Sequence, residues 1–174
     1  MDLSVFNSLP EDEALAQMLG CCHCFRWAAR MVAGRPYADL ESLLQAAEDS
    51  WARVGEADYL EAFSAHARIG DIEKLRNRFS RAHAEQGQVL AASEEVLQQL
   101  FKLNQEYEKK HGFIFIVCAT GKSASEMLRI LQLRLPLSRD QELENAAQEQ
   151  AKITAIRLRA LFAPARVRIH EGAA

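Results

Sequence analysis

Apolar residues recur at helical spacing along almost the whole 174-residue chain, and glycine or proline interrupts each run. The segment 93–111 is the clearest case, because its apolar residues share one side and Gly112 follows directly. The same criteria predict further helices from about residue 9 toward Gly20, over 24–33, from Asp39 to near Gly55, over 58–64, through Leu75 and Phe79 to Gly87, from Ser123 to about Leu135, and over 138–162. The sequence therefore predicts an all-α fold, a single-domain bundle of about eight helices.

Residues that favour helix starts stand at three of these boundaries. Ser8-Leu9-Pro10-Glu11 and Ser123-Ala124-Ser125-Glu126 have the form of a capping box, in which a serine and a glutamate satisfy backbone N–H groups reciprocally. Asp39 can cap the segment that follows it. We therefore expect helices to begin near residue 9, after Asp39 and after Ser123.

One continuous apolar run, Phe113 to Ala119, departs from the helical pattern. Its composition fits a buried strand or an extended segment of the core. Because no other segment offers a strand to pair with it, we predict no sheet.

The composition, 49% hydrophobic and 26% charged, fits one globular domain. We assign residues 1–164 to a single helical domain and residues 165–174 to a loose tail. A net charge of −3 provides no basic surface for a nucleic-acid partner. No apolar run approaches the roughly 18 residues of a membrane span, and no basic-then-apolar leader opens the sequence. We expect a cytoplasmic protein with neither a nucleic-acid nor a membrane partner.

Three of the four cysteines crowd into the run Cys21-Cys22-His23-Cys24, and the fourth is Cys118. Such close neighbours cannot easily form a disulfide framework, which fits a reducing compartment. The run has the residue types of a metal site, but within one helix its side chains fan around the axis, and no second ligand pair exists elsewhere. A buried helical thiol cluster is the favoured interpretation, so no metal is predicted. The apolar flanks of Cys118 favour inert burial.

Gly121-Lys122-Ser123 follows the apolar run and precedes a helix, which is the context of a phosphate-binding loop. The full motif requires a glycine five residues before Gly121, where this chain has Ile116. Without that glycine the loop cannot wrap phosphates. A turn followed by a helix N-cap is the favoured interpretation, and nucleotide binding is the alternative.

Three polar positions interrupt the helical pattern where a site could form. His66 is predicted at a helix end beside a turn, where an imidazole can face a cleft and titrate near neutral pH, or can be a capping or surface histidine. Arg157 falls within an apolar stripe, so its guanidinium either lies along the helix edge or points into a pocket that accepts an anion. Glu85-Gln86 can hydrogen-bond a polar ring or face solvent.

Four strings, HARIGD, EQG, GFIFIVCATGKSA and EQAKITAIRL, occur in that order, and with them the chain resembles the 2-oxo-4-hydroxy-4-carboxy-5-ureidoimidazoline (OHCU) decarboxylases of uric acid breakdown. FNSLPEDEA, WAARMVAGRPYADLESLLQAAEDSW and FKLNQEYEKKHG also resemble that family, so the likeness extends from residue 4 to about 162. It implies an all-helical carboxy-lyase that needs no cofactor, acts on the small molecule OHCU and forms a homodimer.

The resemblance also implies roles for individual residues. The family's proton-transfer histidine corresponds to His66, its Glu-Gln pair to Glu85 and Gln86, and its arginine to Arg157. The segment whose backbone hydrogen-bonds the substrate ring corresponds to five residues, namely Phe115, Ile116, Val117, Cys118 and Ala119.

Two positions in the expected substrate-binding region depart from the family pattern. The proline that usually follows the histidine is Ala67 here, which loosens the backbone that holds the imidazole. A serine often found three residues before the glutamate is Ala82 here, which removes a hydroxyl. These departures keep open the alternative of a non-catalytic helical domain that binds a ureide or a protein partner.

Overall fold

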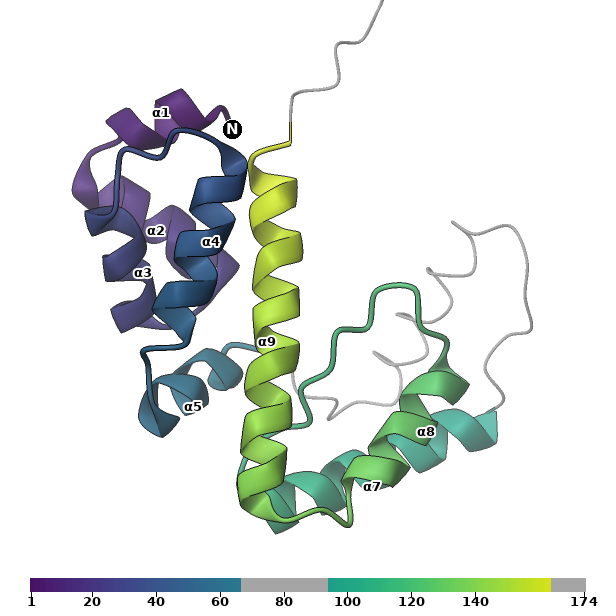
Figure 1. Cartoon of the computed structure of the whole chain (residues 1–174). Coiled ribbons are helices and arrows are strands. Elements are labelled where there is room, and N and C mark those ends of the chain that lie inside the picture. Colours follow the sequence, from purple (N-terminus) through teal and green to yellow (C-terminus); the bar gives the residue numbers. More distant parts are fainter. Residues whose placement is uncertain (67–93, 164–174) are drawn as a thin grey trace, which may run out of the picture. The chain divides into compact units, whose positions relative to one another are not determined.

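The computed structural model describes residues 1–66 and 94–163 of the chain (Figure 1). All regular secondary structure in these ranges is helical, which confirms the predicted fold class. The chain forms two compact units, one of residues 1–54 with 153–174 and the other of residues 55–152. The described residues test neither the domain boundary at 164 nor the loose tail 165–174, and both stay predictions.

The first unit contains four N-terminal helices and the end of a long C-terminal one. These are α1 (Leu3–Ser8), α2 (Glu11–Cys21), α3 (Phe25–Ala33), α4 (Leu40–Trp51) and the last turns of α9 (Arg139–Leu161). Helix α3 packs against both α2 and α4 (Figure 1). Trp27 of α3 is fully buried, and its indole N–H donates to the carbonyl of Ala47 at 3.1 Å. The apolar sides predicted for α3 and α4 form this core.

The first predicted capping box is wrong. Ser8 is the last residue of α1, and its hydroxyl donates to the carbonyl of Ser4 rather than capping α2. Helix α2 begins after Pro10, which makes no side-chain cap. Asp2 supplies the cap that the pattern missed, by accepting from the backbone N–H of Ser4 at 2.8 Å.

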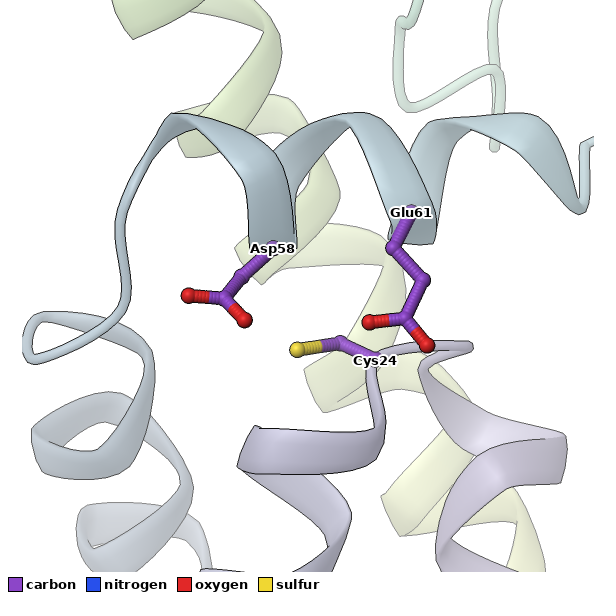
Figure 2. Close-up of side chains that lie close together, drawn as sticks. All are labelled: Cys24, Asp58 and Glu61. Atoms are coloured by element: carbon purple, nitrogen blue, oxygen red, sulfur yellow. The ribbon is translucent and has the colours of Figure 1, made fainter.

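The cysteine run is buried as predicted, but it does not lie within one helix. Cys21 ends α2, Cys22 is its C-cap, and Cys24 is the N-cap of α3 (Figure 2). The three thiols are buried, whereas His23 is exposed. The run is therefore a turn between two helices, and its four side chains do not share one environment.

The second unit contains α5 (Glu56–Ser64), α7 (Glu94–His111), α8 (Ala124–Arg134) and the first turns of α9. Helices α7 and α8 lie side by side (Figure 1). The predicted capping box at Ser123 is present, as is the cap at Asp39 of the first unit. Gly112 ends α7 with a φ of 80°, the left-handed conformation that glycine adopts without strain. Asp58 and Glu61 project from the same side of α5 (Figure 2), and Asp58 caps that helix by accepting from the N–H of Gly55.

The apolar run 113–119 is an extended core segment without a strand partner in the described residues, as predicted. Its aromatic side chains pack against α5 and α7. The ring centroids of Phe113 and Phe63 lie 5.6 Å apart, and those of Phe115 and Tyr107 lie 5.2 Å apart. Among the described helices, none has the length and apolar composition needed to cross a membrane.

Candidate functional site

His66 follows Ala65, the C-cap of α5, at the point where the chain leaves the helix. Its backbone N–H donates to the carbonyl of Phe63 at 3.1 Å, so the last turn of α5 fixes its position. The side chain is half-buried, and ring nitrogen Nε2 is 2.6 Å from Oε1 of Gln150. The prediction of a histidine at a helix end is thus confirmed, and the ring contacts a buried amide of α9.

The extended segment 113–119 is held by hydrogen bonds from charged side chains to its backbone. Glu149 of α9 accepts from the N–H of Cys118 at 2.7 Å, and Lys122 donates to the carbonyl of Cys118 at 2.7 Å. Arg134 donates to the carbonyl of Ile116 at 2.8 Å. The segment therefore has a fixed backbone although it belongs to no sheet.

These bonds decide which backbone groups of the segment can meet a ligand. The N–H of Cys118 and the carbonyls of Ile116, Cys118 and Ala119 already have partners. Within the described residues, no hydrogen bond involves the N–H groups of Phe115, Ile116, Val117 and Ala119 or the carbonyls of Phe115 and Val117. The expectation that the backbone of residues 115–119 hydrogen-bonds the substrate ring stays a prediction.

A buried ionic network supports the same segment from α7, α8 and α9. Glu142 is fully buried and accepts from Arg134 Nε at 2.8 Å, from the hydroxyl of Tyr107 at 2.5 Å and from Asn145 at 2.7 Å. The guanidinium of Arg134 also lies over the ring of Phe115, 4.7 Å from its centroid. Each charge thus has a partner in the interior, as a buried ion pair requires.

The pKa values within this network move in the directions that its hydrogen bonds favour. Burial raises the pKa of Glu142, but hydrogen bonds from Arg134, Tyr107 and Asn145 outweigh it, so the net pKa is lowered. Burial, together with the hydrogen bond to Glu142, raises the pKa of Tyr107. For Glu149, burial likewise raises the pKa, but hydrogen bonds from Lys152 and from the N–H of Cys118 outweigh burial, so the net pKa is lowered. Both carboxylates are therefore ionised at neutral pH.

Arg157 belongs to the first unit, where its guanidinium Nη1 donates to the carbonyl of Cys21 at 3.1 Å. Cys21 is the last residue of α2, so the cation lies at the negative end of that helix dipole. Burial raises the pKa of the Cys21 thiol to about 11, although the charge of Arg157 opposes that shift. The guanidinium thus has a structural partner, and its expected contact with a substrate stays a prediction.

Four expected site residues, Ala67, Ala82, Glu85 and Gln86, lie outside the described residues. Within the second unit, consecutive residues of α9 contact two expected parts of the site, since Glu149 binds Cys118 and Gln150 binds His66. Neither α9 residue was predicted to have a role. The helical spacing of α9 could have indicated Gln150, because it places this residue on the buried side of the helix. The buried residues of that side are Ala146, Ala147, Gln150, Thr154 and Leu158.

The sequence matches the family described as OHCU decarboxylase over residues 7–159. It is 39% identical over 146 residues to the uric acid degradation bifunctional protein TTL of Arabidopsis thaliana, covering 82% of this chain and 45% of that protein. It is 26% identical over 141 residues to the 2-oxo-4-hydroxy-4-carboxy-5-ureidoimidazoline decarboxylase of Halalkalicoccus jeotgali, covering 79% of this chain and 78% of that one. The chain thus spans less than half the length of the Arabidopsis relative.

One solved structure is similar to this chain over most of the length of both proteins. It is the crystal structure of an OHCU decarboxylase in the presence of (S)-allantoin, 35% identical, with a TM-score of 0.70, and the likeness covers 85% of this chain and 98% of that one. The family match includes α5, the extended segment and nearly all of α9. On this basis the chain belongs to the OHCU decarboxylase family.

Proposed function

We propose that this protein decarboxylates OHCU to (S)-allantoin in urate degradation. The observation that carries the proposal is the family match over residues 7–159, together with the likeness to the OHCU decarboxylase crystal structure. His66 stands at a fixed helix end, and the backbone N–H groups of Phe115, Ile116, Val117 and Ala119 make no hydrogen bond within the described residues. Both features suit a small polar ring as substrate.

The substrate itself can accept the electrons that decarboxylation releases. Its reacting carbon carries a carboxylate and a hydroxyl and adjoins a carbon that is doubly bonded to nitrogen. When the bond to the carboxylate breaks, CO₂ leaves and the bonding pair forms a C=C bond, while the C=N pair moves to nitrogen, which takes a proton. The reaction as proposed therefore needs no cofactor.

The resulting enol must then become a ketone. The enol hydroxyl loses its proton, and the neighbouring carbon gains one on a single face, which gives (S)-allantoin. His66 is the proposed proton-transfer residue: it takes the hydroxyl proton and controls delivery to that carbon. A protein group must deliver this proton, because uncatalysed tautomerisation in water would give both enantiomers.

The remaining residues are proposed to hold and orient the substrate. Glu85 and Gln86 bind ureido and ring N–H groups, which selects the face presented to His66. The backbone of the 115–119 segment hydrogen-bonds the substrate ring. Arg157 pairs with an anionic or carbonyl oxygen through guanidinium N–H groups other than the one that binds Cys21. The apolar side chains of the segment favour loss of the charged carboxylate as neutral CO₂.

The test uses substrate generated in place by urate oxidase and hydroxyisourate hydrolase, with circular dichroism of the product. We expect optically active (S)-allantoin to appear quickly with the parent protein. His66→Asn should reduce the rate by at least about 100-fold, the scale of a lost general base. His23→Asn is the matched control, because His23 is exposed.

Two outcomes would count against the proposal at different levels. Racemic product at the spontaneous rate with the parent protein would contradict the activity and favour a ureide-binding domain. A near-parental rate for His66→Asn would contradict the role of His66 alone.

We further propose that the protein is a cytoplasmic homodimer. The resemblance to the family supports the dimer, and the four free thiols, all buried, support a reducing compartment. Light scattering coupled to size exclusion should give twice the 19.5 kDa chain mass. A monomer mass at the concentration of the assay would contradict the dimer.

A further inference from the structure

Gln150 is a polar side chain on the buried side of α9, and the proposed substrate contacts do not use it. It has no exposed surface, and its Oε1 lies 2.6 Å from Nε2 of His66. The two residues are 84 positions apart in the sequence, so the contact joins the end of α5 to the middle of α9. A buried amide normally has a hydrogen-bond partner, and here that partner includes the proposed catalytic imidazole.

The contact with Gln150 favours one tautomer of the His66 ring. An amide oxygen can accept a hydrogen bond but cannot donate one. A distance of 2.6 Å between Oε1 and Nε2 is therefore a hydrogen bond only if Nε2 is protonated. In the neutral imidazole the other nitrogen, Nδ1, then carries the lone pair and is the base.

We propose that Gln150 is a positioning residue, which holds His66 in the tautomer with Nε2 protonated and so makes Nδ1 the atom that accepts the substrate's hydroxyl proton. The catalytic part of this inference rests on the proposed decarboxylase function, whereas the tautomer does not. The Nε2–H bond to Gln150 is unchanged when Nδ1 gains its proton. The ring therefore keeps one orientation while it takes and returns a proton.

The neighbouring residue of α9 strengthens the assignment. Glu149 fixes the backbone of Cys118 at 2.7 Å, and Lys152 binds the same carboxylate from one turn further along the helix. Consecutive residues of one rigid helix therefore hold the imidazole and the extended segment. A shift of α9 would move both parts together, which preserves the geometry that proton transfer requires.

The primary test replaces Gln150 with leucine, which has a similar volume but no acceptor. Nitrogen-15 NMR of ring-labelled histidine should show Nε2 protonated in neutral His66 of the parent. In Gln150→Leu, a substantial fraction of the neutral His66 rings should carry the proton on Nδ1 instead. The kcat should fall about 10-fold to 100-fold, the scale for losing a group that orients a histidine, with KM changed less than about twofold. Gln148→Leu makes the same chemical change at an exposed position of α9 and should match the parent.

A second variant covers the outcome in which Gln150→Leu does not fold. Gln150→Glu keeps an acceptor oxygen at the same place and should keep the proton on Nε2. Its added negative charge should also move the acid limb of the pH–rate profile to higher pH, a change that a purely structural role would not produce.

The two proposals fail in different ways. Neutral His66 with its proton on Nδ1 in the parent, or a tautomer that does not change in Gln150→Leu, would overturn the role of Gln150 even if the protein is an active decarboxylase. Racemic product from the parent would overturn the decarboxylase function, and with it the catalytic part of this inference, while the NMR signals still decide the tautomer.

Discussion

Glu142 shows how a single residue stabilises the fold near the candidate site. It is fully buried, and it compensates the charge of Arg134, which in turn holds the carbonyl of Ile116. Removing one member of a buried pair leaves the other charge without compensation, which costs more than the pair contributes. Replacing Glu142 alone is therefore expected to destabilise the fold mainly because the charge of Arg134 then stays buried without a partner of opposite charge.

Glu142→Gln should lower the free energy of unfolding by about 3–5 kcal/mol, measured by urea denaturation. Glu144→Gln, an exposed position of the same helix, is the control and should change it by less than about 0.5 kcal/mol. The double variant Arg134→Met with Glu142→Leu should lose less than Glu142→Gln, because neither charge remains. Equal losses for Glu142→Gln and Glu144→Gln would contradict a buried, compensated pair.

The same residue makes stability depend on acid. Because the folded pKa of Glu142 is lowered, its contribution is fully present above the unfolded pKa of about 4.3 and is lost as the pH falls through the folded value. The free energy of unfolding of the parent should therefore fall more steeply below pH about 4 than that of Glu142→Gln, measured by the same denaturation series. Parallel slopes for the two proteins would contradict the lowered pKa.

At the scale of elements, the N-terminus of α8 depends on Ser123. Its hydroxyl accepts from the N–H of Glu126 at 3.2 Å, and Glu126 returns a bond to the N–H of Ser123 at 2.7 Å. Ser123→Ala should lower the free energy of unfolding by about 1 kcal/mol, measured by thermal or urea denaturation. Ser125→Ala, at an exposed position in the first turn of α8, should change it by less than about 0.5 kcal/mol.

The N-cap at Ser123 also bears on the alternative that Gly121-Lys122-Ser123 is a phosphate-binding loop. Gly121 has a φ of 74°, Lys122 donates to the carbonyl of Cys118, and Ser123 caps α8. All three residues thus have the structural roles of a turn and an N-cap, which was the favoured interpretation.

The sequence predicted elements where a local signal decides the structure. Asp39, Gly112 and Ser123 each act within a few residues, and the helix ends that they set were predicted within one or two positions. The other end of α4 has no such signal, and it lies at Trp51, four residues before the predicted end near Gly55. The prediction at Ser8 was wrong because Asp2 also acts as an N-cap and starts an earlier helix. Asp2 initiates α1, and α1 then takes Ser8 as its last residue.

The candidate site was less predictable because its contacts join distant residues. The helix-end position of His66 followed from a local break in the pattern, but its partner Gln150 lies on another helix. Spacing places Gln150 on the buried side of α9 without saying which polar group it meets. Roles for Glu85, Gln86 and Arg157 came from the family resemblance, since spacing left their alternatives open.

At the scale of the whole molecule, α9 is the element that both units share. Its residues up to Lys152 belong to the second unit, and those from Ile153 belong to the first. Independent unfolding of either unit would break this helix in its interior and leave backbone N–H and carbonyl groups without partners at the new ends. We therefore expect the two units to unfold together.

Replacing Lys152 with proline tests this coupling at the boundary. Lys152 is exposed, and proline there removes the N–H bond within the helix and clashes with the preceding turn, at a cost of about 3 kcal/mol or more. Both tryptophans, Trp27 and Trp51, lie in the first unit, so their fluorescence reports on that unit, whereas far-ultraviolet circular dichroism reports on all helices. In the parent and in Lys152→Ala the two signals should change at the same urea concentration. In Lys152→Pro the transitions should separate, and transitions that are already separate in the parent would show that α9 does not couple the units.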